Sequence, residues 1–302
     1  MSAPDVVVIG SVNMDLVARS PRLPVPGETV SGSEFATIPG GKGANQAVAA
    51  SRLGAGTAMI GCVGEDAFGE SLRGGLELDG IDCSGLRVIP GVSSGVALIV
   101  VDQGGRNGIV IVAGANGRLE PADIDANEPL LAAARIAVMQ LEVPLPTVAH
   151  AAARARALSK LVVLNPAPAQ PLPRELIASV DYLVPNEIEA AALTGVPVDS
   201  VEAAMAAGTR LRGGGARNVL VTLGARGVVA VTASGARHHP APEVKAVDTT
   251  AAGDTFIGGL CAALVESRPL DAAIRFAQAA AALSVTRFGA QPSIPRRAEV
   301  AE

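Results

Sequence analysis

The stretch "DVVVIG", Asp5–Gly10, is a short β-branched apolar run that ends in glycine. This pattern predicts a strand that is buried on both faces, as in a parallel sheet. Five other runs share the pattern, namely "TAMIGCVG", "IAVMQLE", "KLVVLNP", "DYLVPN" and "NVLVTLG". The runs are separated by Ala-rich helical segments, such as "GANQAVAASRLG", "PTVAHAAARARALS" and "NEIEAAALTG". The alternation predicts βαβ units and a doubly wound α/β sheet.

The composition fits one large α/β domain over residues 1–302. Hydrophobic residues make up 49% of the chain and charged residues 18%, so the chain can bury a sizeable core. Two small domains would also fit the length, but neither a linker nor an internal repeat divides the sequence. The formal net charge of −5 and the lack of a Lys/Arg run argue against nucleic-acid binding. A phosphorylated ligand stays possible, because it needs only a few local donors.

The sequence predicts neither a signal peptide nor a membrane helix. No basic segment precedes the first apolar run, and no uninterrupted apolar span is long enough to cross a bilayer. The three cysteines, Cys62, Cys83 and Cys261, show no C-x-x-C spacing, which is typical of buried thiols in a reducing compartment. We therefore expect a cytoplasmic protein without a membrane or nucleic-acid partner.

One region departs from the alternation of strands and helices. Ser94–Asn116 consists of two strand-like runs around a Gly-rich turn, and together with Glu28–Gly41 it could form a small antiparallel sheet. We expect this sheet, built from about residues 14–40 and 93–114, to be a lid beside the main sheet. The alternative is an ordinary hairpin insertion that carries no function.

Polar residues follow most of the predicted strands at their carboxyl ends, where open α/β sheets bind their ligands. They are Asn13, Asp15, Glu142, Asn165, Asn186, Glu187, Glu189, Thr222 and Gly224, and, after a strand expected near Val244, Asp248, Thr249 and Thr250. Each one alone could form a turn or cap a helix. Placed together at one edge, Asn and Asp side chains suit the hydroxyls of a sugar.

The segment "GGKGANQA", Gly40–Ala47, is a glycine-rich loop that opens a helix. It does not match the phosphate loop of nucleotide hydrolases, and the dinucleotide fingerprint G-x-G-x-x-G is missing from the chain, which disfavours a dehydrogenase. Its glycines would let backbone approach a ligand closely. Lys42 within it could be a ligand contact or an ordinary surface lysine.

Two further patterns are set aside. "GVSSG", Gly91–Gly95, matches the nucleophile elbow of serine hydrolases, but a strand rather than a helix is expected after Ser93. His150 falls in a helical run, and His238 and His239 are expected in a loop. Adjacent side chains point apart, so the histidine pair is not expected to bind a metal.

The segment "AVDTTAAGDTFIGGLCAAL", Ala246–Leu264, carries the chemistry. Phe256, Leu260 and Leu264 recur every four positions, which predicts a helix that begins near Ala252. A helix N-terminus offers unpaired N–H groups to an anion, and a carboxylate there stays ionised. Asp254 could therefore take the proton of an incoming hydroxyl beside a bound phosphoryl group, which predicts phosphoryl transfer to an alcohol.

Several motifs together resemble the ribokinase group of the PfkB-type carbohydrate kinases. They are "GSVNMD", "PGETVSG", "GGKGANQA", "NPAPA", "LVPNEIEAAALTG", "TLGARG", "VDTTAAGDTF" and "GAQPSIP", spread from about Val6 to Pro295. The resemblance implies a three-layer α/β/α sandwich with a mostly parallel central sheet and a small β-sheet lid. It also implies an ATP-dependent kinase that converts D-ribose to ribose 5-phosphate with Mg²⁺ and is activated by K⁺. A homodimer through the lid is implied as well.

The resemblance assigns roles to residues of this sequence. Asp254 matches the catalytic base, and the anion hole matches Ala251, Ala252 and Gly253. The sugar contacts match Asn13, Asp15, Gly41, Lys42, Asn45, Glu142 and Asp254. The nucleotide, with its Mg²⁺ and phosphates, matches Asn186, Glu189, Thr222, Gly224, Gly227, Gly253 and, at the adenine, Gln278. The monovalent cation matches Asp248, Thr250, Ser284, Arg287, Gly289 and Ser293, mostly through backbone carbonyls, with Thr250 where the family often has Ile.

Other functions stay open at this point. A kinase of the same family for deoxyribose, fructose or adenosine would share Asp254 and the glycine loop. A sugar-binding protein without catalytic activity is a more remote alternative, because a pure binder needs no base at the position of Asp254.

Overall fold

The computed structural model describes residues 3–301 and contains two sheets and ten α-helices in that range. The larger sheet has nine strands in the order β13-β12-β11-β10-β9-β8-β1-β4-β5. Their bounds are β1 Val6–Ile9, β4 Thr57–Gly64, β5 Asp82–Ile89, β8 Ile136–Met139, β9 Leu161–Leu164, β10 Tyr182–Leu183, β11 Asn218–Thr222, β12 Val228–Thr232 and β13 Gly235–His239. All neighbours pair in parallel except β11–β12 and β12–β13, so the sheet is mostly parallel, as predicted.

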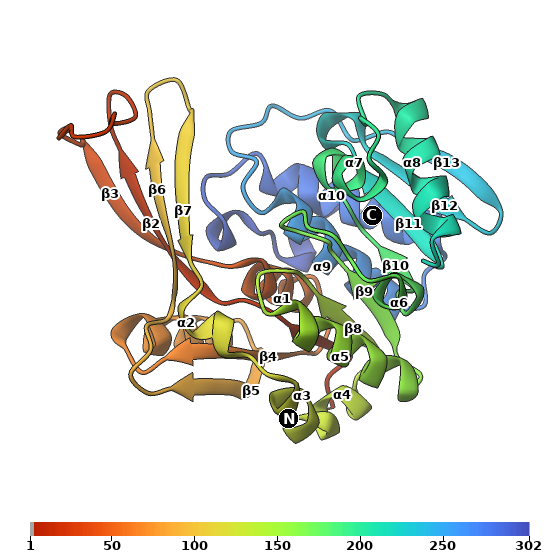
Figure 1. The fold of residues 1–302 in the computed structure, drawn as a ribbon. Coiled ribbons are helices and arrows are strands. Elements are labelled where there is room, and N and C mark those ends of the chain that lie inside the picture. Colours follow the sequence, from red (N-terminus) through yellow and green to blue (C-terminus); the bar gives the residue numbers. More distant parts are fainter. Residues whose placement is uncertain (1–2, 302) are drawn as a thin grey trace.

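Helices cover both faces of this sheet and give three layers (Figure 1). One face packs against α1 Lys42–Arg52, α2 Ala67–Leu78, α9 Ala252–Val265 and α10 Leu270–Ser284. The other packs against α3 Pro121–Ala126, α4 Glu128–Ala133, α5 Leu145–Ala157, α6 Arg174–Ala178, α7 Glu187–Thr194 and α8 Val201–Gly213. Within β1, Val6 and Val8 join the first core while Val7 and Ile9 join the second, and all four are fully buried. Burial on both faces explains why the strand is apolar throughout.

The lid is a separate four-stranded sheet that stands away from the sandwich (Figure 1). Its order is β3-β2-β6-β7, with β2 Asn13–Arg19, β3 Glu34–Gly40, β6 Gly95–Val101 and β7 Asn107–Val112. The expected antiparallel sheet is instead mixed, because β2 pairs with β6 in parallel. Strands β2 and β6 follow the carboxyl ends of β1 and β5, which run in the same direction, so both enter the lid in the same direction.

Two local predictions were wrong. No strand forms near Val244, since residues 241–247 have no regular structure. Pro240 and Pro242 cannot donate backbone hydrogen bonds there, and Val244 is 45% exposed with no apolar layer to cover it. His238 and His239 do not lie in a loop but end β13, where they pair with β12. In the described part of the chain, no helix has the length and apolarity needed to cross a membrane.

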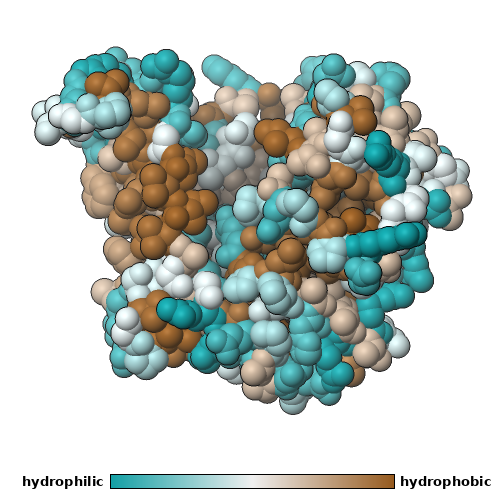
Figure 2. Space-filling model, viewed as in Figure 1, coloured by the Kyte–Doolittle hydropathy of each residue, from teal (hydrophilic) through white to brown (hydrophobic). Residues whose placement is uncertain are grey.

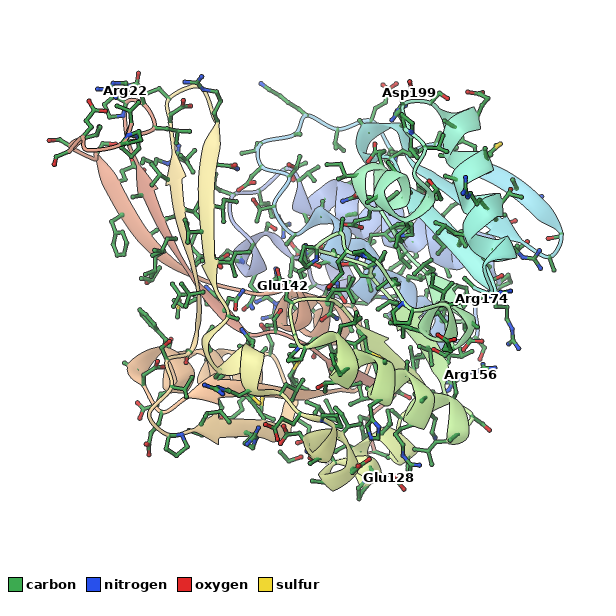
Figure 3. The ribbon with its side chains drawn as sticks, in the orientation of Figure 1. Arg22, Glu128, Glu142, Arg156, Arg174 and Asp199 are labelled. Carbon is green, nitrogen blue, oxygen red and sulfur yellow. The ribbon has the colours of Figure 1, made fainter. Side chains whose placement is uncertain are left out.

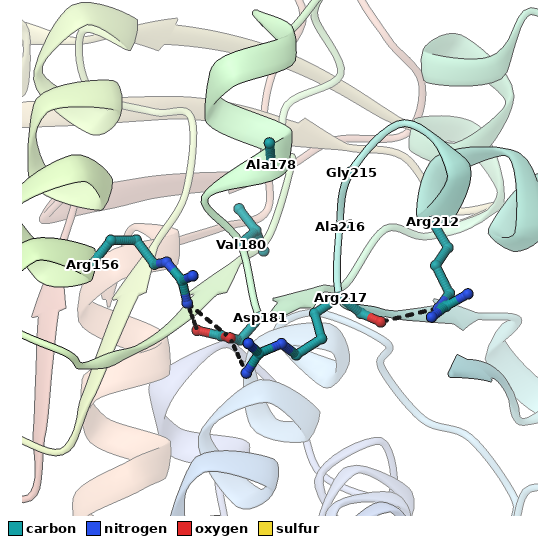
Figure 4. A pocket seen from close by; sticks show the side chains of 8 residues that line it. All are labelled: Arg156, Ala178, Val180, Asp181, Arg212, Gly215, Ala216 and Arg217. Carbon is teal, nitrogen blue, oxygen red and sulfur yellow. Dashed lines mark hydrogen bonds and ion pairs between the residues drawn. The ribbon is translucent and has the colours of Figure 1, made fainter. Parts of the chain in front are cut away.

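At the amino ends of β9, β10 and β11, one buried carboxylate joins the strands (Figure 4). Asp181 is 1% exposed, and its Oδ2 accepts a hydrogen bond of 2.9 Å from Val162 N. Its Oδ1 lies 3.2 Å from Nη1 of Arg156 and 3.1 Å from Nη1 of Arg217. A hollow of about 360 Å³ lies against this cluster. The two guanidinium groups neutralise a charge that burial would otherwise make costly.

Candidate active site

The start of α9 lies at the opposite side, beside the carboxyl ends of the strands. Ala251 is the N-cap residue of α9 and has a left-handed backbone with φ 59°, which turns the chain sharply before the helix. Asp254 lies in the first turn and is 7% exposed. A Cβ added to Gly253 would meet no atom within 4 Å, so the space before this helix end is open. The free N–H groups of the first turn suit an anion in that space.

A pocket of about 190 Å³ lies at this helix end. Residues from five separated parts of the chain line it. Those with predicted roles are Lys42, Asn186, Glu189, Thr222, Ala251, Ala252, Gly253 and Asp254. The pocket thus joins a lysine, the predicted base and the N-terminus of α9 around one space large enough for a phosphoryl group.

Asn186 and Glu189 form hydrogen bonds with each other. Asn186 is the N-cap of α7, and its Oδ1 accepts from Glu189 N at 2.9 Å. Glu189 in turn accepts from the backbone N and from Nδ2 of Asn186, both at 2.9 Å. The pair is therefore a capping box, and it also lines the pocket. The helix-capping and ligand-binding interpretations of these residues are compatible.

The predicted sugar contacts surround the other side of Asp254. Asn45 donates from Nδ2 to Asp254 Oδ2 at 3.1 Å, while its buried Oδ1 has no hydrogen-bond partner. Glu142 accepts from Ser11 Oγ at 2.6 Å and from Lys42 N at 3.0 Å. Glu142 lies between the base of the lid and the sandwich (Figure 3). The unpaired Asn45 oxygen is an acceptor that a ligand hydroxyl would satisfy.

Glycines let the loop before α1 pack directly on the end of β1. Gly41 has φ 87°, and a Cβ there would lie 2.7 Å from Asn13 N. A Cβ at Gly43 would lie 2.6 Å from Ser11 N, and one at Gly40 would overlap the Asp15 carboxylate. The glycines thus serve close packing between the loop and β2, which brings Lys42 toward Asp254.

Asn13 and Asp15 begin β2, so the predicted sugar contacts lie at the root of the lid. Asn13 is 4% exposed, and its Oδ1 accepts from Asn116 Nδ2 at 2.7 Å. Asn116 also exchanges hydrogen bonds with the backbone of Val12. This contact of Asn116 could not be predicted from the sequence, because Asn116 lies more than a hundred residues from its partners.

Like charges crowd this edge. Burial, followed by the charges of Glu142 and Asp254, raises the pKa of Asp15 from 3.8 to about 7. Burial also raises the pKa of Glu189. For Lys42, burial favours the neutral amine, but the carboxylates of Asp254, Glu142 and Glu189 outweigh it and raise its pKa. Lys42 is therefore a cation that faces several carboxyl groups.

The remaining predicted nucleotide residues lie beside β13. Gly224 begins a short 3₁₀ turn, and Gly227 ends it with φ 97° where a Cβ would overlap His239 O. Gln278 is 6% exposed, and its Nε2 donates to His239 O at 2.9 Å and to Pro240 O at 3.3 Å. Gly227 and Gln278 thus contact the same backbone segment, and the amide nitrogen of Gln278 is engaged within the protein.

Hydrogen bonds join five of the six predicted cation residues in two groups, Asp248 with Thr250 and Gly289, and Ser284 with Arg287. Asp248 accepts from Thr250 N at 2.9 Å and from Gly289 N at 2.9 Å. Burial opposes the ionisation of Asp248, but these hydrogen bonds lower its pKa. Ser284 accepts at its backbone oxygen from Arg287 N, and Ser293 donates from Oγ to Ala290 O. Within residues 3–301, no cluster of three or more His, Cys, Asp or Glu side chains could hold a metal ion.

The chain matches the model of the pfkB family of carbohydrate kinases over residues 3–297. It is 44% identical to the ribokinase of Haemophilus influenzae over 295 residues, which cover 98% of this chain and 96% of that protein. It is 41% identical to the deoxyribokinase of Salmonella typhimurium over 292 residues, which cover 96% and 95%. The structure of Arabidopsis thaliana ribokinase with ribose and ATP is similar with a TM-score of 0.90 and 34% identity, over 99% and 97% of the chains.

Proposed function

The chain belongs to the pfkB family of carbohydrate kinases, and we propose that it transfers a phosphoryl group from ATP to the 5-hydroxyl of D-ribose. The observation that carries the proposal is the position of Asp254. This carboxylate lies in the first turn of α9, beside the open space at Gly253 and within hydrogen-bond distance of Asn45. A base and an anion site therefore meet where a hydroxyl and a phosphoryl group must react.

In this function Asp254 accepts the proton of the sugar hydroxyl as its oxygen attacks the γ-phosphorus and the bond to the leaving ADP oxygen breaks. Asn45 Oδ1, a buried acceptor without a partner, would orient the sugar by accepting from one of its hydroxyls. The N–H groups of Ala252 and Gly253 and the cation of Lys42 would stabilise the negative charge on the transferred group.

We also propose Mg²⁺ as the ion that accompanies ATP. Mg²⁺ prefers carboxylate, carbonyl and phosphate oxygens, and the donors of Asn186 and Glu189 beside the pocket fit that preference. When bound, the ion would neutralise phosphate charge. For the monovalent cation K⁺, the fit rests on Asp248, an ionised and partly buried carboxylate next to the turn that leads into α9.

We also propose a homodimer through the lid, which the apolar residues exposed on the lid support. Phe35 is 67% exposed, and Ile109, Val110 and Ile111 of β7 are between 51% and 60% exposed. Figure 2 shows a hydrophobic area on the lid. An exposed patch of this kind marks a protein interface. Ile109→Glu combined with Ile111→Glu should yield a monomer in light scattering, and a monomeric wild-type protein would contradict the proposal.

The cytoplasmic location remains our expectation. The three cysteines are buried and unpaired, which suits a reducing compartment. Burial raises the pKa of Cys62 and of Cys83 to about 11, so these thiols are inert.

The test of the proposed function is ADP release with ATP, Mg²⁺ and K⁺ across D-ribose, 2-deoxyribose, fructose and adenosine. A strong preference for ribose is expected. A preference for 2-deoxyribose would favour the second candidate function, which the 41% identity to a deoxyribokinase supports. Turnover of neither sugar would contradict both assignments.

A further inference from the structure

Two buried glutamines form a chain of hydrogen bonds that ends at Asp254. Gln46 of α1 donates from Nε2 to Asp254 Oδ1 at 2.9 Å, while Asn45 holds the other carboxylate oxygen. Gln140 directly follows β8 and donates from Nε2 to Gln46 Oε1 at 2.6 Å. Gln46 is 1% exposed and Gln140 is fully buried.

We propose that Gln46 and Gln140 are positioning residues that fix the carboxylate of Asp254 for proton transfer. This inference rests on the proposed kinase function, in which Asp254 is the base. Neither glutamine is assigned a contact with the sugar or the nucleotide. Gln140 acts only through Gln46, and Gln46 acts through Asp254.

The hydrogen bonds of Gln46 leave its amide only one orientation. Its Nε2 also lies 3.3 Å from Asn165 Oδ1, so the nitrogen faces two acceptors and the oxygen faces one donor. A rotated amide would set its oxygen against both Asp254 and Asn165 and its nitrogen against the nitrogen of Gln140. The donor from Gln140 therefore supports the orientation in which the nitrogen of Gln46 meets the base.

Stability alone does not explain Gln140. Its Oε1 is buried without a hydrogen-bond partner, and an unsatisfied buried polar group lowers the stability of the fold. The chain also keeps glycine at position 10, where a Cβ would overlap this same oxygen. An apolar side chain at position 140 would remove this unpaired oxygen but would leave the buried Oε1 of Gln46 without its donor, so the amide at position 140 serves Gln46.

The orientation of Asp254 matters for the reaction step more than for binding. Proton transfer needs the lone pair of the base aligned with the hydroxyl in the transition state, whereas sugar and ATP binding rely on other contacts. Asp254 is also faced by the charged groups of Asp15, Lys42 and Glu189. Loss of the Gln46 donor would leave one oxygen of the Asp254 carboxylate without the partner that fixes its orientation.

The experiment compares Gln46→Met, Gln140→Met and the double variant with the wild type, using the sugar that the wild type phosphorylates. We expect kcat to fall by about 100-fold for Gln46→Met and about 10-fold for Gln140→Met, with KM values within about twofold, since an aligned base supplies a factor of about 10²–10⁴. The double variant should be no slower than Gln46→Met, because Gln140 acts through Gln46.

Thr147→Val is the matched control, since it removes a buried hydrogen bond, from Thr147 Oγ1 to Leu119 O, outside the site. It should leave kcat unchanged. Gln140→Met removes the unpaired oxygen of Gln140 but leaves Gln46 Oε1 without its donor, so its melting temperature should stay close to that of the wild type, and kcat is compared at a temperature at which both proteins are folded. Additive effects in the double variant, or unchanged kcat in Gln140→Met, would overturn the proposal. Wild-type turnover tests the proposed function separately, so the two failures are distinct.

Discussion

Buried carboxylates are paired with cations at the amino ends of the central strands but crowd together at the carboxyl ends. At the amino ends of the strands, Asp181 is paired with two arginines and accepts a backbone N–H (Figure 4). At the carboxyl ends, several carboxyl groups crowd around Lys42, and mutual repulsion contributes to the raised pKa of Asp15. The first arrangement holds strands together. The second keeps charges that the fold does not need, as expected where a ligand supplies the missing partners.

The largest effect is expected for Asp254→Asn, at the carboxyl ends of the strands. The side chain keeps its size and can still hydrogen-bond, but it can no longer accept a proton. We expect kcat to fall by about 10³-fold, since general base catalysis contributes about 10²–10⁴. Calorimetry should find sugar and ATP binding retained. Turnover near that of the wild type would remove Asp254 as the base.

At the opposite edge, Asp181→Ala should change stability instead of turnover. The variant leaves Val162 N without its partner and removes the anion between Arg156 and Arg217. We expect the free energy of unfolding in urea to drop by about 2–3 kcal/mol. The kcat of the folded variant should match the wild type at 20 °C below its melting temperature. A marked loss of kcat with unchanged stability would mean that the two edges are not separable in this way.

Removing a carboxylate charge at the carboxyl ends of the strands, at Asp15, should raise the stability of the protein. The raised pKa of Asp15 means that the folded protein holds a proton which the unfolded chain releases between pH 4 and 7. Asp15 therefore lowers stability as pH rises through this window. Asp15→Asn removes that loss and should be more stable than the wild type at pH 8, by about 1–2 kcal/mol because water screens a half-buried group.

Thermal unfolding at pH 4 and pH 8 measures this prediction. The two proteins should differ at pH 8 and converge at pH 4, where Asp15 is largely protonated in the folded state. Equal pH dependence in both would contradict it. The stabilised variant should bind the sugar poorly, because Asp15 is a predicted sugar contact.

The smallest effect is expected from the monovalent cation at the turn before α9. Replacing Na⁺ with K⁺ should raise kcat of the wild type, since the cation would order the loop that carries Ala251 and Ala252. Asp248→Ala should abolish the difference between the two salts, because it removes the carboxylate that holds Thr250 and Gly289. Steady-state assays at equal ionic strength measure the effect. A wild type indifferent to the cation would rule out the assigned site.

The sequence was sufficient for the parts of the fold that local patterns encode. Apolar runs such as Val6–Ile9 and Leu161–Leu164 predict strands because both of their faces are buried. Strand β5 was missed, since it lies at the edge of the sheet and carries exposed residues such as Ser84 and Arg87. The parallel pairing of β2 and β6 depends on the directions of β1 and β5, which neither hairpin-like segment encodes.

The residues of the candidate site also fall into those that local motifs predict and those that they do not. Residues in glycine-rich motifs, such as Lys42 and Asp254, were predicted because the motifs are local. Gln140 and Asn116 were not, since each acts through a partner about a hundred residues away and neither position has a distinctive neighbour. Gln46 lay inside a quoted motif, but only the hydrogen bond to Asp254 indicates its role.

Strand β2 also has a mechanical meaning. It runs without interruption from Asn13 to Arg19, so its root carries Asn13 and Asp15 while its far end lies near the tip of the lid. At about 3.3 Å per residue the strand is about 20 Å long, and a rotation of about 10° at the root would carry its far end about 4 Å. Because the predicted sugar contacts lie at this root, a rotation of the lid about its root would change the angle at which Asn13 and Asp15 face a ligand.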